Sequence, residues 1–577
     1  MQRLRHPFTL KRVFLSITFG LSLSACSSVS NHVTPLQADS QWAPVAQSTH
    51  AKQLEQVLGA EFTLQRQGSQ QASTLYLEVA QQSSDEGIAK RATSTAVMSD
   101  DTQAILNASQ RWLELNPSAS EAYPVRLQAL LNTEQTDQAA ELLIQARQHN
   151  AALGFLPNFV DQNVRHENIT SQLEDILSAP ELSKDLYVEI AQYHLLFING
   201  GYPYIVENIG QLITRSPKSE LEGLIVIKAL SEEQLGFKNK AQRTLVQGLK
   251  QHPNSQRIQA NLLEILIKNG KSQQALDAFY DADFPPYLAQ QIGLGMGQLL
   301  IQQGHLEQSI ALLSDLPRHG VLRDQLLFML ANAQHEAGQF DEALNNLINV
   351  FGQLSWTASE TIVKWLYSVH QADLVNGIIL KRAALDSEPG HIMGVADLHV
   401  QQRQPELAID LLTRSLSVFP DVDSLRYKRA ITYDMQEQWA AALDDLKLLL
   451  EKHPNDPAYL NALGYTLMVR SPDDFDEAFE LIQQAYALDD EDPAILDSMG
   501  WAYYLNGDID SARDLLAQAW NEMQDAEIGA HFGEVLWHKG KHEQALAIWH
   551  QALKDNASLP TLIKTLEKYA PQLLEGA

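Results

Sequence analysis

The sequence predicts an all-α fold in which helix-turn-helix units stack into one long solenoid. Two periodic patterns indicate it. Small residues recur every 34 positions, at Ala241, Ala275, Ser309 and Ala343, and glycines keep the same step, at Gly236, Gly270, Gly304 and Gly338. A constant step of about 20 to 50 residues is typical of repeat proteins, whose units each bury an apolar face against their neighbours. An unrelated all-α bundle would not keep this phase along the chain.

The pattern resumes in the C-terminal part, with small residues at Ala408, Ala442, Ala478, Ala512 and Ala545. Another small residue lies twelve positions before most of the periodic ones, at Gly297, Ala331, Ala396, Ala430, Gly500 and Gly533, and Gly464 stands fourteen before Ala478. The segments ILDSMGWAYYLNGDIDSARDLLAQAW and LRYKRAITYDMQEQWAAALDDLKLLLEKHP are the best copies. They resemble the tetratricopeptide repeat (TPR), in which small residues lie where two helices cross closely. This resemblance implies a right-handed superhelix with a concave face.

The elements follow in order from the N-terminus. Basic residues precede an apolar stretch that ends in Leu23, Ser24, Ala25 and Cys26, and no acidic residue interrupts it. This is the shape of a secretory signal, too short for a transmembrane helix. The ending resembles the lipobox of bacterial lipoproteins, which implies a signal peptide over 1–25, a lipid on the Cys26 thiol and, with Ser at position 27, the outer membrane. An ordinary signal peptide with an incidental Cys is the alternative.

Residues 26–50 carry no helical stripe and are expected to form a flexible tether after the lipidated Cys. Divergent helical repeats are expected over 51–215, regular repeats over 216–350, and an irregular helical repeat over 351–395. The repeats of 396–558 match the pattern well. Residues 559–577 are expected to form a capping helix and tail.

Composition excludes several functions. The chain has 577 residues, of which 42 are Lys or Arg, 71 are Asp or Glu and one is Cys, with a net charge of −29. One Cys excludes disulfides and Cys-ligated metal clusters, and the acidic balance excludes a basic surface for nucleic acid. An acidic surface favours basic partners instead.

Candidate catalytic and metal motifs have simpler explanations. Asn269–Ser272 resembles the end of a phosphate-binding loop without its first Gly, and Gly293, Gly295 and Gly297 imitate a dinucleotide loop with no preceding strand. His538 and His542 have the spacing of two ligands on one helix, but Gly540 predicts a turn between them. We therefore predict no catalytic residue, no metal and no cofactor.

The concave face is the predicted binding surface. In the TPR family, positions 2, 5, 9 and 12 of the first helix line it, and in the C-terminal repeats these positions give Tyr427, Asn461, Tyr465, Trp501, Tyr504 and Trp537, together with Asp497 and Glu534. Aromatic side chains offer much contact area for little lost rotamer freedom, which suits a bound polypeptide. The alternative is that these rings only pack between neighbouring repeats.

Lipobox, tether and long solenoid together resemble the large TPR outer-membrane lipoproteins of Gram-negative bacteria, and are similar to LbcA-like adaptors of periplasmic carboxy-terminal processing proteases. The resemblance implies a non-enzymatic adaptor in the periplasm that brings a serine protease together with peptidoglycan hydrolases. The alternative is an assembly scaffold for another envelope complex, for secretion, lipopolysaccharide or peptidoglycan synthesis.

Overall fold

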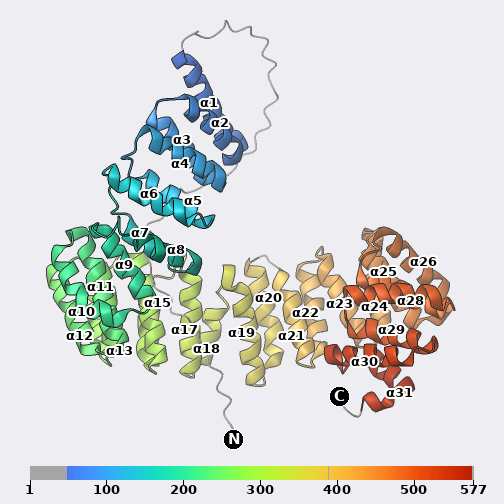
Figure 1. Ribbon diagram of the computed structural model, residues 1–577. Helices are drawn as coiled ribbons and strands as arrows, with labels where there is room; N and C mark the ends of the chain where they lie inside the picture. Colours follow the sequence, from blue (N-terminus) through green and yellow to red (C-terminus); the bar gives the residue numbers. More distant parts are fainter. Residues whose placement is uncertain (1–48, 387–388, 575–577) are drawn as a thin grey trace, which may run out of the picture. The chain divides into compact units, whose positions relative to one another are not determined.

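The structure is a computed structural model that describes residues 49–386 and 389–574. Every regular element in these ranges is a helix and none is a strand, which confirms the predicted all-α class (Figure 1). The chain divides into two compact units, the first ending at Phe284 and the second beginning at Pro285. None of the described helices combines the length and the apolar character needed to span a membrane.

The predictions for the extreme N-terminus lie outside the described residues. They are the signal peptide at 1–25, the lipobox residues Leu23, Ser24 and Ala25, the lipidated Cys26, and the tether as far as residue 48. The first described helix begins at Thr49, so the last two residues of the predicted tether, 49 and 50, are helical.

The first unit consists of fourteen described helices joined by short turns. They are α1 (Thr49–Gln67), α2 (Ser69–Gln82), α3 (Glu86–Ser99), α4 (Thr102–Leu115), α5 (Ala122–Asn132), α6 (Thr136–Gln148), α7 (Leu156–Gln162), α8 (Glu167–Leu177), α9 (Leu186–Ile198), α10 (Tyr202–Arg215), α11 (Lys218–Gln234), α12 (Lys238–Gln251), α13 (Gln256–Lys268) and α14 (Ser272–Tyr280).

The second unit continues the same arrangement with α-helices and four 3₁₀ turns. The described elements are α15 (Pro286–Gln302), α16 (Leu306–Asp315), α17 (Arg323–Glu336), α18 (Phe340–Leu347), η1 (Gly352–Leu354), α19 (Ser355–Ser368), η2 (Ala372–Leu374), α20 (Val375–Asp386), α21 (Gly390–Gln401), α22 (Pro405–Val418), α23 (Asp423–Met435), α24 (Trp439–Lys452), α25 (Pro457–Arg470), η3 (Pro472–Asp474), α26 (Phe475–Leu488), α27 (Pro493–Leu505), α28 (Ile509–Glu522), α29 (Ala526–His538), α30 (His542–Asn556), α31 (Pro560–Tyr569) and η4 (Pro571–Leu573).

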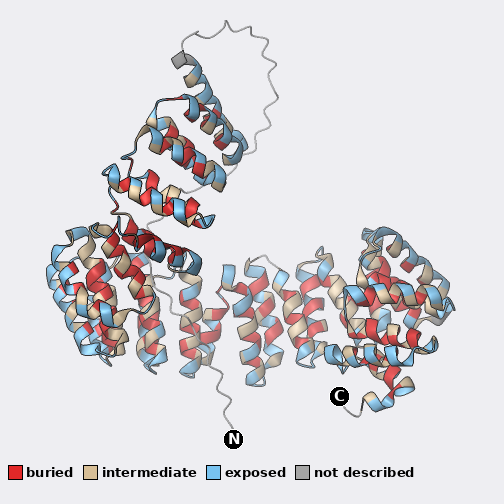
Figure 2. Ribbon diagram, in the orientation of Figure 1, coloured by how far each residue is buried: buried red, intermediate tan, exposed pale blue. Residues whose placement is uncertain are grey.

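Each repeat is a pair of contacting helices, and the first helix of a repeat also contacts the first helix of the next. Thus α25 packs on α26, α27 on α28 and α29 on α30, while α27 contacts both α25 and α29. Buried residues gather on the helix faces turned towards neighbouring helices (Figure 2). The buried residues therefore form successive apolar clusters along each unit, as expected of stacked repeats.

The turn inside each of the regular repeats between residues 216 and 350 uses a left-handed residue. The predicted turn glycines Gly236, Gly270, Gly304 and Gly338 all have positive φ, between 74° and 81°. Glycine adopts this conformation without a Cβ clash and ends the first helix. The structure thus confirms the inter-helix turns predicted from the glycine ladder.

The second small residue of each repeat lies where the paired helices cross. A Cβ added at Gly500 would be 2.7 Å from Leu516 Cγ, and one at Gly464 would be 2.9 Å from the Ala478 carbonyl oxygen. Both distances are shorter than real Cβ contacts, so at these two crossings even an Ala would force its neighbours to shift. This explains the spacing of twelve or fourteen residues between the two small positions.

Candidate functional site

The six residues predicted to line the concave face all lie on first helices of C-terminal repeats. Tyr427 is on α23, Asn461 and Tyr465 are on α25, Trp501 and Tyr504 are on α27, and Trp537 is on α29. Asn461 is buried, and the five aromatic residues are half-buried. Each of the five aromatic residues therefore keeps part of its surface open to solvent.

Three rings from two neighbouring helices form a stack centred on Trp501. Its indole stacks on Tyr504 of the same helix, with ring centroids 4.8 Å apart, and on His531 of α29, with centroids 4.1 Å apart. Such pairs contribute about 0.5 to 1.5 kcal/mol beyond their buried area. The stack therefore holds Trp501 in a fixed orientation on this face.

His531 is fixed from its other side by Asp497. Its Nδ1 lies 3.0 Å from both carboxylate oxygens of Asp497, and both residues are buried. Burial lowers the pKa of His531, but the charge of Asp497 and the hydrogen bond to it outweigh burial, so that the pKa is raised. The raised pKa favours the form of His531 in which Nδ1 carries a hydrogen and donates to Asp497.

Two further carboxylates from α29 take hydrogen bonds from tyrosines. Tyr465 donates to Glu527 at 2.7 Å, and burial raises the pKa of Glu527. Tyr504 and Tyr569 donate to Glu534 at 3.3 and 2.9 Å. The bond from Tyr465 links α25 to α29, two repeats further along the chain.

We name Tyr465, Trp501, Tyr504, Glu527, His531 and Glu534 the aromatic–acidic surface. The Trp501 ring already stacks on Tyr504 and His531, and Glu534 already lies 3.4 Å from Lys568 Nζ. A Lys or Arg side chain that reaches Glu527 or Glu534 gains charge attraction there. The chemistry therefore suits a partner segment that carries basic residues.

The other three predicted residues do not join this surface. Tyr427 pairs with Tyr459, with ring centroids 5.3 Å apart. Asn461 donates a long hydrogen bond of 3.5 Å to the Ala494 carbonyl. These contacts favour the alternative in which such residues pack between repeats.

Trp537 belongs to a terminal aromatic cluster. Its ring centroid lies 5.6 Å from Trp549, 6.1 Å from Tyr569 and 4.2 Å from His542. This cluster closes the last repeat against α31, so the position of Trp537 also favours a packing role.

Local sequence explains why α27 presents Trp501 and Tyr504. The carboxylate of Asp492 accepts hydrogen bonds from the backbone N–H groups of Ala494 and Ile495, at 2.8 and 3.1 Å, and Pro493 occupies the first helical turn. This N-cap fixes where the helix begins. The first residue after the crossing at Gly500 is then Trp501.

Sequence reasoning missed His531, although the signal was present. His531 follows Asp497 by 34 residues, so the two occupy the same position in consecutive repeats. Equivalent positions of contacting helices lie side by side in a solenoid. A 34-residue separation between an Asp and a His therefore predicts that the two side chains face each other. Tyr569 was missed because α31 has no small-residue marker.

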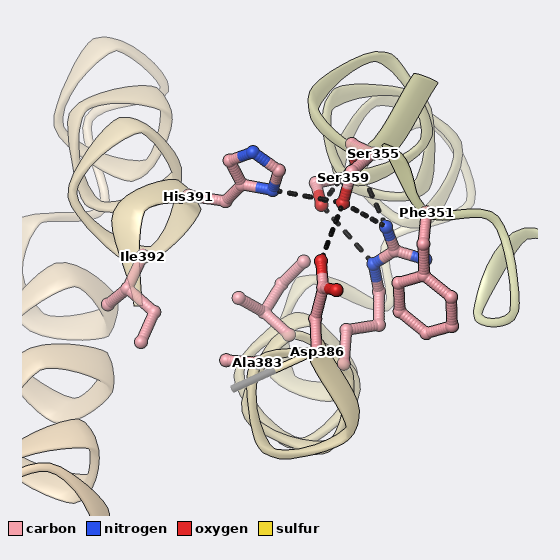
Figure 3. Close-up of a pocket in the computed structure, with 9 residues that line it drawn as sticks. Phe351, Ser355, Ser359, Ala383, Asp386, His391 and Ile392 are labelled. Carbon is pink, nitrogen blue, oxygen red and sulfur yellow. Dashed lines mark hydrogen bonds between the residues drawn. The ribbon is translucent and has the colours of Figure 1, made fainter. Parts of the chain in front are cut away.

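One arrangement in the structure resembles a catalytic triad but lacks its geometry. Ser355 Oγ lies 3.3 Å from His391 Nδ1 and 3.5 Å from the Asp386 carboxylate (Figure 3). In a triad the His bridges Ser and Asp, whereas here the Ser is the bridge. The pocket leaves about 10 Å³ of room, space for about one water molecule, and so offers no place for a substrate.

The motifs set aside on sequence grounds lie where the repeat pattern predicts. Asn269–Ser272 spans the end of α13 and the start of α14, and the turn at Gly540 separates His538 from His542. Gly293 and Gly297 lie inside α15, against Leu316 and Leu313. Among the described residues, no group of three His, Cys, Asp or Glu side chains is placed to hold a metal ion.

Comparison with known proteins identifies the repeats. Models described as tetratricopeptide repeat match residues 325–345, 396–457, 427–493 and 471–531. The matches include the aromatic–acidic surface as far as His531. The fold is therefore a solenoid of tetratricopeptide repeats, as the small-residue ladder predicts.

Two curated relatives match short parts of the chain. A TPR repeat-containing protein of Pseudomonas aeruginosa, PA4667, is 38% identical over 131 residues, which are 23% of this chain and 22% of that protein. Bacteriophage adsorption protein A of Escherichia coli is 33% identical over 116 residues, 20% of this chain and 11% of that protein. The chain thus covers less than a quarter of either relative.

Solved structures with similar helix arrangements include the Cut9–Hcn1 hetero-tetramer of the APC/C and yeast Tom70. The first is 14% identical, covering 90% of this chain and 97% of that chain with a TM-score of 0.30. The second is 16% identical, covering 90% of this chain and all of that chain with a TM-score of 0.26.

Proposed function

We propose that this tetratricopeptide-repeat protein is a non-enzymatic adaptor, held at the outer membrane by a lipid on Cys26, with its solenoid in the periplasm. It brings a carboxy-terminal processing protease together with the peptidoglycan hydrolases that the protease degrades. The observation that carries the binding role is the aromatic–acidic surface on α25, α27 and α29. Its fixed rings and carboxylates suit basic protein segments.

The mechanism is an increase of effective concentration. When one surface of the solenoid holds the protease and another holds its substrate, cleavage becomes an intramolecular encounter. A long repeat stack suits this task because repeats far apart along the stack present separate surfaces, so they can bind different partners. The adaptor itself needs no catalytic group.

Affinity capture from envelope extract tests the binding role. We expect the wild-type chain, at low salt and with a crosslinker, to recover a serine protease and cell-wall hydrolases identified by mass spectrometry. Trp501→Ala combined with Glu534→Gln should lower recovery of at least one of them by about tenfold, since the combination removes the stack and a carboxylate.

The matched control for this capture is Trp439→Ala. Trp439 is also a half-exposed Trp but lies on α24, a second helix outside the aromatic–acidic surface. Recovery of neither class of enzyme by the wild-type chain would refute the adaptor function. Recovery of synthases or barrel proteins without a protease would favour the assembly scaffold instead.

A separate experiment tests the anchor. We expect the wild-type protein to incorporate labelled palmitate and to sediment with outer membranes, because Cys26 is the only thiol of the chain. Cys26→Ala should abolish both. Labelling of the Cys26→Ala protein would show that the lipid is attached elsewhere and that the lipobox assignment is wrong.

A further inference from the structure

The first described helix, α1, has two apolar faces, and only one of them is packed. Ala60 is fully buried and Val57 is half-buried in the cluster that α1 shares with α2. On the other face Leu54, Leu58 and Phe62 are 61%, 47% and 57% exposed. Residues four apart share one face of a helix, and residues two apart, such as Leu58 and Ala60, point to nearly opposite sides. We name Leu54, Leu58 and Phe62 the apolar stripe.

The place of α1 in the stack explains why this face has no cover. α1 packs on α2, and α2 contacts α4 as the first helices of successive repeats do, so α1 takes the place of a second helix. A second helix inside the stack packs on a first helix on each side, as α26 does on α25 and α27. Among the described residues, α1 has such a partner on the α2 side alone (Figure 1).

The other end of the solenoid is built differently. The last α-helix, α31, exposes Lys564, Glu567 and Lys568. A polar outer face of this kind keeps the end of a repeat stack soluble. The N-terminal end instead presents the apolar stripe to the surroundings, which indicates that the stripe has an occupant.

The exposed charges of α1 differ in sign from those of the whole chain. Lys52, Glu55 and Arg66 are exposed, whereas the Glu61 carboxylate is held in an ion pair on the packed side. Two positive charges and one negative charge therefore accompany the stripe, in a chain whose net charge is −29. The Arg66 guanidinium also lies 5.9 Å from the centre of the Phe62 ring. An Arg above an apolar ring is typical of a boundary between an apolar and a polar phase.

We propose that the apolar stripe binds the surface of the membrane at which the N-terminus is anchored. α1 lies parallel to the bilayer, with its three apolar side chains in the boundary between headgroups and acyl chains. Amphipathic helices bury their apolar face by about 5 to 10 Å in this way, and their cations attract anionic headgroups. The partner is therefore a bilayer that contains anionic phospholipid.

The position of α1 in the chain favours lipid over another occupant. The 22 residues 27–48 separate α1 from Cys26, and a coil of that length spans roughly 25 Å. A chain with a lipid on Cys26 thus keeps α1 within reach of the bilayer, whereas a second copy or another protein has to arrive by diffusion. Three side chains bind a membrane weakly, so the stripe acts as a second contact beside the anchor. In this respect the inference rests on the anchor of the proposed function.

The test replaces the native anchor by one of known chemistry. The protein is the chain from residue 26 onward with Cys26→Ala and an N-terminal hexahistidine tag, held on vesicles of phosphatidylethanolamine and phosphatidylglycerol that contain a nickel-chelating lipid. Because Cys26 is the only Cys of the chain, an introduced Cys can be labelled with the polarity-sensitive dye NBD. Leu58→Cys places the dye in the stripe. Gln56→Cys is the matched control, at an exposed position of α1 outside the stripe.

We expect the dye at position 58 to gain intensity and to shift to shorter wavelength on the vesicles. The dye at position 56 should keep the spectrum that it has in water. A quencher attached to the lipid near the headgroup should quench the dye at position 58 alone. Vesicles without phosphatidylglycerol should give a smaller shift, since the cations of α1 then lose their anionic partners.

Unlabelled variants measure the contribution of the stripe to binding. Leu54→Gln, Leu58→Gln and Phe62→Gln together should lower the affinity of the tagged protein for the vesicles about tenfold. The circular dichroism spectrum should not change, because these side chains lie away from the packed face. The control combines substitutions at three exposed apolar residues of the second unit and should leave the affinity unchanged; they are Val418→Gln, Leu488→Gln and Met523→Gln.

Equal spectra of the two labelled proteins on vesicles would overturn the proposal, as would equal affinities of the two triple variants. A shift at position 58 without vesicles would overturn it too. Together with a doubled mass in light scattering, that shift would assign the stripe to a second copy of the chain, and in a monomer it would assign the stripe to residues 27–48. The tag takes the place of the lipid, so a failure of lipidation at Cys26 would leave this result unchanged.

Discussion

Arg382 shows how a single side chain holds an irregular part of the solenoid together. It is 3% exposed, and its guanidinium donates to the backbone carbonyls of Leu347, Val350 and Ser355. Burial lowers its pKa to about 10, so it stays charged at neutral pH. The residue thus connects α20 to the chain between α18 and α19, where the 34-residue phase is lost.

Replacing this residue tests its structural role. We expect Arg382→Met to destabilise the protein by about 3 kcal/mol, because it fills similar space but leaves buried carbonyls without donors. Urea unfolding followed by circular dichroism measures the loss. Arg414→Met is the control, since Arg414 is half-exposed and pairs only with Asp410, and we expect a change below about 0.5 kcal/mol. Equal effects of the two substitutions would contradict the assignment.

His399 gives the protein a dependence on pH. It is fully buried, its Nε2 donates to Asn376 Oδ1 at 2.9 Å, and its Nδ1 accepts from the Tyr367 hydroxyl. The Asn376 Nδ2 group donates to Asp410, so Asn376 Oδ1 is the acceptor for the His399 Nε2–H group. In the neutral ring Nδ1 then carries no hydrogen and accepts from Tyr367. Burial lowers the pKa of His399 to about 4.

The sign of the effect follows from proton binding. Between pH 6.5 and about 4 the unfolded chain protonates this His and the folded chain does not, so stability falls as the pH falls through that window. We expect this His to remove about 2 kcal/mol between pH 7.5 and pH 5. His399→Gln should shrink the difference between the two pH values by that amount in urea unfolding. An unchanged difference would show that His399 is not buried as a neutral ring.

For single residues, the sequence predicts the helix on which a side chain lies better than the residues that it contacts. The spacing places Trp501 and Tyr504 on the first helix of a repeat, and in the structure both lie on α27. It does not predict Arg382, because Arg is usually exposed and the repeat phase fails around it. It also leaves open whether an aromatic residue contacts solvent or a neighbouring ring, which depends on the packing of both helices.

The turn between paired helices keeps its left-handed backbone even in some repeats that lack the marker glycine. Left-handed φ angles occur at Gly540, as predicted, and at Gly507, but also at Glu134, Arg403 and Glu437, where φ is 57° or 58°. The turn geometry therefore persists where glycine is absent. A left-handed non-glycine residue costs about 1 to 2 kcal/mol, which the packing of the two helices offsets.

A reciprocal pair of substitutions tests the cost of a non-glycine residue at a left-handed turn. Gly507→Ala should destabilise the second unit by about 1 kcal/mol, and through the backbone alone, because an added Cβ there meets nothing within 4 Å. Arg403→Gly should be neutral or stabilise by up to about 1 kcal/mol, since relief of strain outweighs the entropy that glycine adds to the unfolded chain. Thermal unfolding midpoints measure both. A stabilised Gly507→Ala protein would contradict the argument.

Helix existence was predictable wherever the 34-residue step holds, because small residues mark crossings and glycines mark turns. The divergent stretches lack these markers. There the structure has the seven-residue helix α7 and the 3₁₀ turns η1 and η2. Such short elements are fixed by contacts distant in sequence, which no periodicity reveals.

The chain divides into two compact units, and each of them buries several apolar clusters. In the first unit, clusters centre on Tyr76, Leu143 and Ile227, and in the second, on Ile362, Leu463 and Trp549. A solenoid gains stability from each repeat and each interface between neighbours, so a long enough part of it folds alone.

We therefore expect residues 49–284 and 285–577, produced as separate fragments, each to fold as a helical protein with its own cooperative thermal transition. Circular dichroism of both fragments tests this. As a control, a cut inside a repeat, between α27 and α28, should leave fragments that melt broadly. A fragment beginning at residue 285 with no cooperative transition would show that the second unit depends on the first.

The hydrogen bond from Tyr465 to Glu527 has a mechanical consequence. A solenoid is flexible because adjacent repeats can rotate slightly relative to each other, and these small rotations add along the stack. This bond joins helices two repeats apart, across the repeat that carries Trp501. Bending that moves α25 away from α29 lengthens this bond. The C-terminal repeats therefore resist bending more than a stack held only by contacts between adjacent repeats. A force on a bound partner would be transmitted along them with little deformation.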